Sequence, residues 1–428
     1  MKKTRQVLQQ LRDYESRNVT HIAADGSWPI VWERARGVHV WDAEGKKYLD
    51  LTAAFGVANA GHANPRVVRA GQQQMATLLH AMGDVHPHAQ KAQLARELSR
   101  LTFERWSGGA TIAKVIYNNS GFEAVEAALK TARLATGKRG VIAFKGAYHG
   151  LGYGALNVTH REHFRGAFRD QLGEFGQFAR FPAHDADLPQ LEKELRALFK
   201  KHVIGAILAE PIQARGGINV PPTEFLPLLR RLCDENGALL ILDEIYTGFV
   251  RTGRWFACEH SSVMPDLICL GKALTGGFPL SACVGRADVM DAAWPASTGE
   301  AIHTSTFLGH PVGCAMALAQ IAEIRRLKLV GHSARLGKKL LADLSQLKSK
   351  NWILKTRGVG LMTGLELRRR DGSHASTETM AVIKAMLHRG FILLPEGEHG
   401  NVIGFTPPLT ITDLQLRETL AALGDLLA

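Results

Sequence analysis

Short apolar runs alternate with longer amphipathic stretches through the middle of the chain. The runs are mainly continuous, as in strands buried on both faces of a parallel sheet. They are Lys114–Tyr117, Gly140–Phe144, Val203–Ala209, Ala238–Leu242, Leu267–Leu270 and Ser281–Gly285. Helical spacing predicts helices near 65–82, 88–103, 121–136, 188–201, 225–236, 310–327 and 331–349. Strands alternating with such helices predict a doubly wound α/β domain with a mostly parallel sheet.

The two ends of the chain carry a different pattern. Residues 1–20 show helical spacing, and the stretch Val31–Asp50 alternates and turns twice at glycine, which predicts a β-meander. Residues 353–428 predict the strands and helices of a smaller α+β domain. We therefore expect a small domain built from both chain ends. Its parts would be residues 1–60 and 320–428, and the large domain would be residues 61–319.

Two of the central runs end at groups that are costly to bury. Ala238–Leu242 is followed by Asp243, and Leu267–Leu270 is followed by Gly271 and Lys272. Ligands bind at the carboxyl ends of strands in open α/β sheets, so both groups are expected at a ligand site. Burying both is unfavourable unless each has a partner or a task. Considered separately, Asp243 could cap a turn and Lys272 could be a solvated loop lysine.

Together the acid and the amine suit one flat cofactor, pyridoxal phosphate (PLP). A lysine holds its aldehyde as a Schiff base, and an aspartate pairs with its protonated pyridine nitrogen. Desolvation lowers the pKa of a lysine, which favours the neutral amine that attacks an aldehyde. Lys272 and Asp243 are therefore the candidate catalytic residues.

Longer motifs around this pair resemble a known family. The segments DEIYTGFVRTGRWFA, which begins at Asp243, and LGKALTGGFPLSA, which contains Lys272, resemble the class III aminotransferases of the ornithine and 4-aminobutyrate type. The resemblance covers nearly the whole chain. It implies PLP as the cofactor and the fold type I architecture, in which a large α/β domain carries a smaller α+β domain.

The resemblance places the cofactor phosphate on Ser120, Gly121 and Phe122. These residues lie between a predicted strand and a predicted helix, where backbone N–H groups form an anion site. Ser120 with Glu123 three residues later also forms a capping box, and the two interpretations are compatible. No G-x-G-x-x-G motif follows a strand, which argues against a dinucleotide site.

Further cofactor contacts follow from the resemblance. The aromatic residue before HG stacks on the cofactor in that family, so Tyr148 is the candidate, with His149 beside it; a core aromatic is the alternative for Tyr148. Glu210 matches the family's EP motif, and Ile245 is expected on the ring face opposite Tyr148. Tyr246 replaces the usual Gln, and its phenol could donate a hydrogen bond to the cofactor's 3-oxygen.

Two more residues are assigned by resemblance. The segment HTSTFLGHP resembles the one whose threonine reaches the phosphate of the neighbouring subunit, and that residue is Thr306 here. This implies a homodimer. A turn before the helix at Pro311 is the alternative. Phe55 lies where the family begins to line its substrate pocket.

Three positions depart from the enzymes that use ω-amino acids and 2-oxoglutarate. Those enzymes typically have an Arg after HG, a Glu in EPxQxEGG and an Arg before the late PPL, whereas this chain has Leu151, Arg215 and Gly404. Bidentate pairing with Arg makes carboxylate recognition tight. We therefore do not expect a typical ornithine, acetylornithine or 4-aminobutyrate aminotransferase. We hypothesise that Arg215 anchors a substrate carboxylate.

Composition narrows the remaining classes. The net charge is +12, but the basic residues form short clusters mostly beside acids, which argues against a nucleic-acid partner. No apolar run approaches the ~20 residues of a membrane helix. The basic N-terminus is not followed by an apolar stretch, so we expect a cytoplasmic protein. The five cysteines lack a C-x-x-C pair, and the segment His86–His88 lacks a third ligand, so no metal site is expected.

The sequence thus predicts a PLP-dependent aminotransferase that moves an amino group between an amine or amino acid and an oxo acid. A racemase, epimerase or aminomutase on the same scaffold would use the same residues and differ in where the proton returns. A PLP-binding protein without turnover would also carry them.

Overall fold

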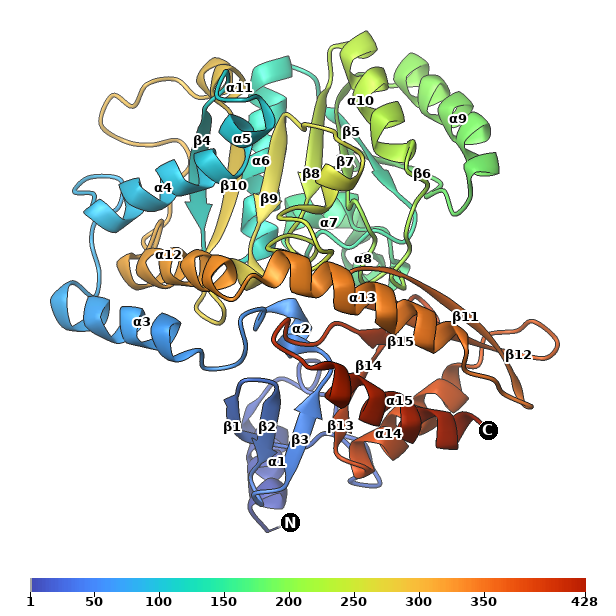
Figure 1. The fold of residues 1–428 in the computed structure, drawn as a ribbon. Coiled ribbons are helices and arrows are strands. Elements are labelled where there is room, and N and C mark those ends of the chain that lie inside the picture. The colour runs from blue at the N-terminus through green and yellow to red at the C-terminus, as the bar shows by residue number, and fades with distance from the viewer. Residues whose placement is uncertain (1) are drawn as a thin grey trace.

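The computed structural model describes residues 2–428, and its centre is a seven-stranded sheet with the order β4-β10-β9-β8-β7-β5-β6 (Figure 1). The strands are β4 (Ala113–Asn118), β5 (Gly140–Phe144), β6 (Gly176–Ala179), β7 (Ile204–Ala209), β8 (Leu239–Asp243), β9 (Leu267–Leu270) and β10 (Ser281–Arg286). Strand β10 runs antiparallel to both of its neighbours, and the other neighbouring pairs are parallel. This is the expected α/β architecture.

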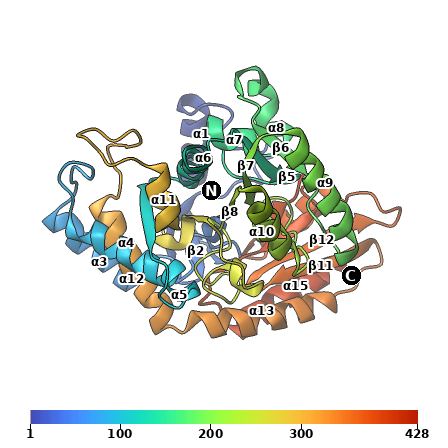
Figure 2. The same ribbon diagram turned by 90° about the horizontal axis from the view of Figure 1, so that it is seen from above.

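Alternate residues of the central strands enter two apolar cores. In β7, Ile207 and Ala209 face one core, while Ala206 and Leu208 face the other. The first core is covered by α4 (Ala89–Leu101), α5 (Phe103–Trp106), α9 (Leu188–Lys201), α10 (Phe225–Asn236) and α12 (Pro311–Arg326). The second is covered by α6 (Gly121–Thr136), α7 (Tyr153–Val158) and α11 (Ala287–Ala293), so helices flank both faces (Figure 2). Burial on both faces explains why the runs are continuously apolar.

Segments from both chain ends lie together below the large sheet in Figure 1. The predicted meander is present as β1 (Trp32–Arg36), β2 (His39–Asp42) and β3 (Lys47–Asp50), and β13 (Phe391–Ile392) adds to β3 in parallel. A second small sheet has the order β11-β12-β15-β14, from β11 (Trp352–Val359), β12 (Met362–Arg369), β14 (Leu394–Glu396) and β15 (Val402–Phe405). The pairing of β3 with β13 joins the two ends. The domain limits at residues 60 and 320 stay a prediction.

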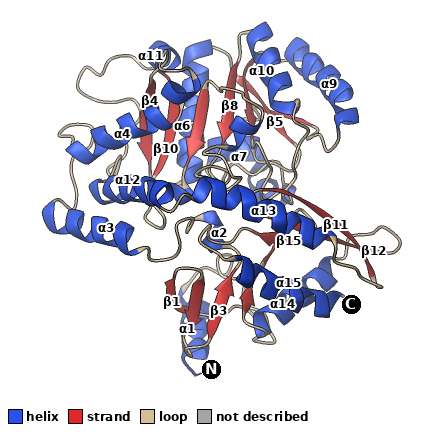
Figure 3. Cartoon of the chain, viewed as in Figure 1, coloured by secondary structure: helices blue, strands red, loops and turns tan. Residues whose placement is uncertain are grey.

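The remaining helices surround these sheets (Figure 3). They are α1 (Lys2–Tyr14), α2 (Ala53–Gly56), α3 (Pro65–Thr77), α8 (Glu162–Arg165), α13 (Leu329–Ser345), α14 (Ser376–His388) and α15 (Asp413–Leu427). None of the helices between residues 2 and 428 is long and apolar enough to cross a membrane. The helix predicted over 121–136 is α6 and the strand predicted over 140–144 is β5, each with the predicted bounds.

Candidate active site

The carboxyl ends of β5, β7, β8 and β9 meet at one edge of the large sheet. Asp243 is the last residue of β8, Glu210 follows β7, and Lys272 opens the 3-10 turn η4 (Lys272–Leu274) after β9. A cavity of about 340 Å³ lies at this edge. Among the residues predicted from the sequence, its lining includes Gly121, Phe122, Tyr148, His149, Glu210, Arg215, Asp243, Ile245, Tyr246 and Lys272. The structure therefore brings most of the predicted site together.

The amine of Lys272 lies over an aromatic ring in this cavity. Its Nζ is 4.0 Å from the centroid of the Tyr246 ring. Desolvation by the surrounding protein lowers the pKa of Lys272 to about 8, although the carboxylates of Asp243, Glu210 and Glu396 act in the opposite direction. An appreciable share of the amine is therefore neutral near neutral pH, which is the nucleophilic form.

Asp243 is oriented by two hydrogen bonds. His149 Nδ1 lies 2.8 Å from Asp243 Oδ2, and both side chains are buried. The other carboxylate oxygen accepts from the backbone N–H of Ile245 at 3.1 Å. His149 Nε2 is buried and has no hydrogen-bond partner in the described chain. Because buried polar atoms are normally paired, this nitrogen indicates a place for a further polar group next to Asp243.

Glu210 holds two loops at the cavity. Its carboxylate accepts from the backbone N–H of Tyr148 at 3.1 Å and from that of Ala214 at 3.0 Å. Burial raises the pKa of Glu210 to about 7. The ring of Tyr148 packs edge-on against Phe164, with centroids 5.4 Å apart. Glu210 thus positions the Tyr148 loop through its main chain.

The N-terminus of α6 opens towards the same cavity. The predicted capping box is present, because Glu123 Oε2 accepts from the backbone N–H of Ser120 at 2.7 Å and from its hydroxyl at 3.0 Å. Gly121 stands at the first helical position, where a Cβ would lie 3.0 Å from Ile245 Cδ1 and would push that side chain aside. Ser120 itself does not line the cavity, but its carbonyl accepts from Ser281 Oγ at 2.5 Å.

Tyr246 lines the cavity but has a partner within the chain, whereas Phe55 and Thr306 lie outside the cavity. The hydroxyl of Tyr246 is 3.1 Å from Thr406 Oγ1, so its predicted hydrogen bond to a cofactor oxygen stays a prediction. Phe55 is 49% exposed and Thr306 is exposed, and neither lines the cavity of its own chain. Phe55 lies in α2, which contacts the η4 turn that carries Lys272.

Arg215 already has a carboxylate partner within the chain. Its Nη1 donates to Glu396 Oε2 at 2.9 Å, and Glu396 is the last residue of β14. Glu396 passes beside Gly404 of β15, where a Cβ would lie 3.0 Å from Glu396 Cγ. Leu151 also lines the cavity. A carboxylate from β14 therefore meets Arg215 where the sequence predicted only a free guanidinium.

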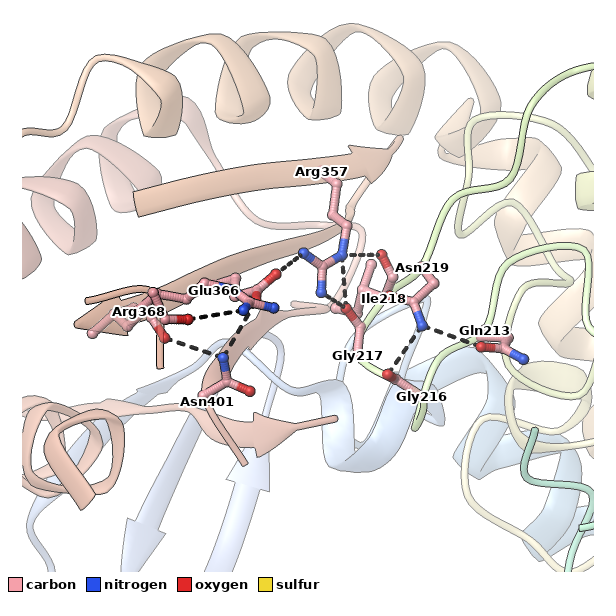
Figure 4. Close-up of polar contacts among 11 residues, drawn as sticks. Gln213, Gly216, Gly217, Ile218, Asn219, Arg357, Glu366, Arg368 and Asn401 are labelled. Atoms are coloured by element: carbon pink, nitrogen blue, oxygen red, sulfur yellow. Dashed lines mark hydrogen bonds and ion pairs between the residues drawn. The ribbon is translucent and has the colours of Figure 1, made fainter. Parts of the chain in front are cut away.

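The loop that carries Arg215 is clamped from the C-terminal part of the chain (Figure 4). Arg357 of β11 donates to the carbonyl of Gly217 at 2.7 Å and to that of Ile218 at 3.1 Å, and it pairs with Glu366 at 2.6 Å. Within the loop, Asn219 donates to the carbonyl of Gly216 at 3.1 Å. These contacts fix the backbone of residues 216–219 against the second small sheet.

Sequence reasoning missed Glu396, Arg161 and Thr406. The Arg161 guanidinium donates to the carbonyl of Arg215, and Thr406 contacts Tyr246. Glu396 and Arg161 stand in none of the motifs described above, and Thr406 lies directly before the late PPL, where only Gly404 was considered. The one signal for Glu396 was indirect: an Arg in the place of a Glu calls for an acid elsewhere.

Comparison with known proteins identifies the family. The model of class-III aminotransferases matches residues 22–427. This chain is a class-III aminotransferase. It is 37% identical to the 5-aminovalerate aminotransferase of Pseudomonas aeruginosa over 93% of both chains. It is 36% identical to the putrescine aminotransferase of Pectobacterium atrosepticum, over 95% of this chain and 84% of that one.

A solved structure agrees in fold. The ornithine aminotransferase of Toxoplasma gondii, which is described with partial occupancy of PLP at its active site, superposes with a TM-score of 0.84. It is 29% identical, over 99% of this chain and 94% of that one. The enzyme therefore has the predicted fold type I architecture and uses PLP as its cofactor.

The residues of the cavity fit this cofactor. PLP combines an aldehyde, a pyridine nitrogen and a phosphate, and the cavity offers an amine, a buried carboxylate and a helix N-terminus. The close approach at Gly121 leaves no side chain between the α6 N-terminus and Ile245. The donor set of the site is thus complementary to the three polar parts of PLP.

Proposed function

We propose that this enzyme transfers an amino group from an amine or amino acid to an oxo acid, with Lys272 as the covalent anchor of PLP. The observation that carries the proposal is the shared cavity in which Lys272, with a pKa lowered to about 8, faces the Asp243–His149 pair. Bound PLP supplies an electron sink for the carbanion formed beside the substrate nitrogen.

Each residue then has a task. Lys272 would hold the cofactor aldehyde as a Schiff base, and its freed amine would be the group that moves the substrate proton. Asp243, oriented by His149, would keep a proton on the pyridine nitrogen. Tyr148 and Ile245 would contact the two faces of the ring. The backbone N–H groups of Gly121 and Phe122 would bind the phosphate, whereas that of Ser120 already donates to Glu123.

We also propose that the substrates differ from those of the typical ornithine and 4-aminobutyrate enzymes. Leu151 and Gly404 stand where those enzymes have arginines, so this chain lacks both of their guanidinium groups. Arg215 remains as the candidate anchor for a carboxylate. The named relatives act on 5-aminovalerate and putrescine, an amino acid and a diamine. The two substrates carry opposite charges at the end that lies far from the reacting amine. The residues around that far end therefore decide specificity.

We propose a homodimer in which Thr306 completes the partner's phosphate site. Thr306 is exposed, and next to it Phe307 is 53% exposed and packs against His80 at 5.3 Å. Leu79 and Met82 near that contact are 59% and 54% exposed, so this side offers an apolar surface to a second copy. All five cysteines are free and buried, which suits the reducing cytoplasm that we propose as the compartment.

The test follows the visible absorbance of the purified enzyme as amines and amino acids are added without an oxo acid. A donor that converts the lysine-bound cofactor to its aminated form supports transamination. Exchange of the substrate α-hydrogen with solvent while the band persists would favour the racemase alternative. Lys272→Ala is expected to lose the band and all turnover, whereas Lys145→Ala, an exposed lysine after β5, keeps both.

A further inference from the structure

The two members of the Arg215–Glu396 ion pair differ in their exposure to solvent. The Arg215 side chain is 31% exposed, whereas that of Glu396 is 6% exposed. Arg215 is also the only group of the described chain that donates a hydrogen bond to the Glu396 carboxylate. The acid is thus the buried member. Arg215 is the cation hydrogen-bonded to it, and Lys272 and Arg161 act on it through their charge alone.

The two side chains also differ in their freedom to move. Glu396 sits in β14, which pairs with β15, and its stem packs on Gly404. The backbone of Arg215 is held, because its carbonyl accepts from Arg161 and, at 3.2 Å, from the backbone N–H of Gly397. Beyond the Cα, the long Arg215 side chain reaches the solvent-exposed side. The guanidinium can therefore swing away, and the carboxylate stays in place.

Removing Arg215 from this pair would leave a buried carboxylate without its hydrogen-bonded cation. Breaking a buried ion pair by loss of one partner costs about 3–5 kcal/mol. Burial already raises the pKa of Glu396 to about 6, so the carboxylate is ionised at pH 8. A ligand that displaces the guanidinium is therefore favoured when it brings a positive charge of its own. A ligand whose end is neutral or anionic brings no positive charge to the Glu396 carboxylate.

Glu396 lies behind Arg215, which lines the same cavity as the reacting amine, and its charge acts on that amine. Its charge raises the pKa of Lys272, and the Lys272 amine lowers that of Glu396 in turn. Both groups thus belong to one electrostatic site, with Arg215 lining the cavity between solvent and the sheet edge. Lys272 and Arg215 line one cavity, so a substrate held at Lys272 reaches Glu396 only where the Arg215 side chain gives way.

We infer that Glu396 is a specificity residue that binds the far ammonium group of a diamine donor, which takes the place of Arg215. The inference rests on the proposed transamination and adds the substrate class: α,ω-diamines as donors. When the diamine has left, Arg215 returns to Glu396 or meets the carboxylate of the oxo acid. Glu396 takes no part in the chemical step.

The test compares two donors of equal length, 1,5-diaminopentane and 1-aminopentane, in single turnovers at pH 8 without an oxo acid. The wild type should bind the diamine at least about tenfold more tightly, which is the value of a charge-assisted hydrogen bond. Glu396→Gln should reduce that ratio to about one. Arg215→Met should keep or widen the ratio, because it removes the competing cation.

The matched control is Glu398→Gln, which makes the same change in charge two residues away at an exposed position. It should keep the wild-type ratio, and thermal unfolding checks that each variant is folded. The inference is overturned if the wild type binds both donors equally, or if Glu396→Gln and Arg215→Met alter both donors by the same factor. In either case consumption of the monoamine would still support transamination. If no donor is consumed, the proposed function itself fails.

Discussion

At the scale of single residues, the site is controlled by opposing effects on one amine. Desolvation lowers the pKa of Lys272, while the nearby carboxylates, Asp243 first among them, raise it. Desolvation is the larger effect, since the pKa settles at about 8 instead of its ordinary 10.5. Asp243 therefore has two consequences: it offers an anion to a pyridine nitrogen, and it keeps the lysine more protonated than burial alone would.

We expect cofactor-free protein to show this balance directly. Acetylation of Lys272 by acetic anhydride should rise with pH and reach half of its maximal rate near pH 8, because only the neutral amine reacts. In Asp243→Asn the midpoint should move to lower pH, since the lost anion had stabilised the ammonium form. Asp185→Asn, a change at an exposed acid, serves as the control. A midpoint near that of a solvated lysine would contradict this account.

Residues in local motifs could be predicted from the sequence, and residues that depend on distant partners could not. Lys272, Asp243 and Gly121 follow recognisable strand ends, and all three line the cavity. Glu396 has its partner 181 positions away, and no periodicity or motif records such a contact. The role of Arg215 was inferred only from its replacing the Glu of the motif EPxQxEGG. That comparison could not predict its ion pair with Glu396.

At the scale of elements, helix and strand positions follow from burial, but strand direction does not. The antiparallel direction of β10 is invisible in its apolar run, because a run buried on both faces looks the same in either direction. Strand β6 escaped prediction because its sequence, GQFA, is short and interrupted by glutamine. The clamp of β11 on the loop of residues 216–219 was equally hidden, since Arg357 stands in an ordinary strand pattern.

The contact of Arg357 with the loop of residues 216–219 can be tested by substitution. Arg357→Met should leave the carbonyls of Gly217 and Ile218 unpaired and lower the free energy of unfolding by about 2 kcal/mol. Hydrogen exchange measured by mass spectrometry should speed up in residues 213–219. Arg370→Met is the control, because its contacts to the carbonyls of Ser349 and Lys350 are exposed. Unchanged exchange in the loop would show that the loop is held without Arg357.

At the scale of the whole molecule, the large sheet depends on both chain ends. Arg251 is fully buried, and burial lowers its pKa to about 10. Its guanidinium donates to the Asn59 side chain, to the carbonyl of Leu361 at 3.0 Å and to that of Pro407 at 2.5 Å. One side chain from the large domain thus satisfies acceptors from residues near both termini.

The proposed dimer makes a sharp prediction at this scale. The Lys272→Ala and Thr306→Ala variants should each be impaired when expressed alone. Co-expression of the two chains should restore activity, because one site of the mixed dimer then has both native residues. Activity per mixed dimer should approach half of the wild-type value. Lys272→Ala mixed with Asp243→Asn should show no rescue, since both residues line the cavity of one chain. Failure of the first mixture to recover would place Thr306 outside the partner's site.

The parallel pairing of β13 with β3 has a consequence for biosynthesis. Strand β3 ends at Asp50 and β13 begins at Phe391, so the ribosome must make the intervening chain before this sheet can close. The last strand of the seven-stranded sheet ends at Arg286, so all strands of that sheet are made well before β13. A nascent chain therefore contains Lys272 and Asp243 while Glu396 is still missing. Control over which amine enters is the last property that the growing enzyme acquires.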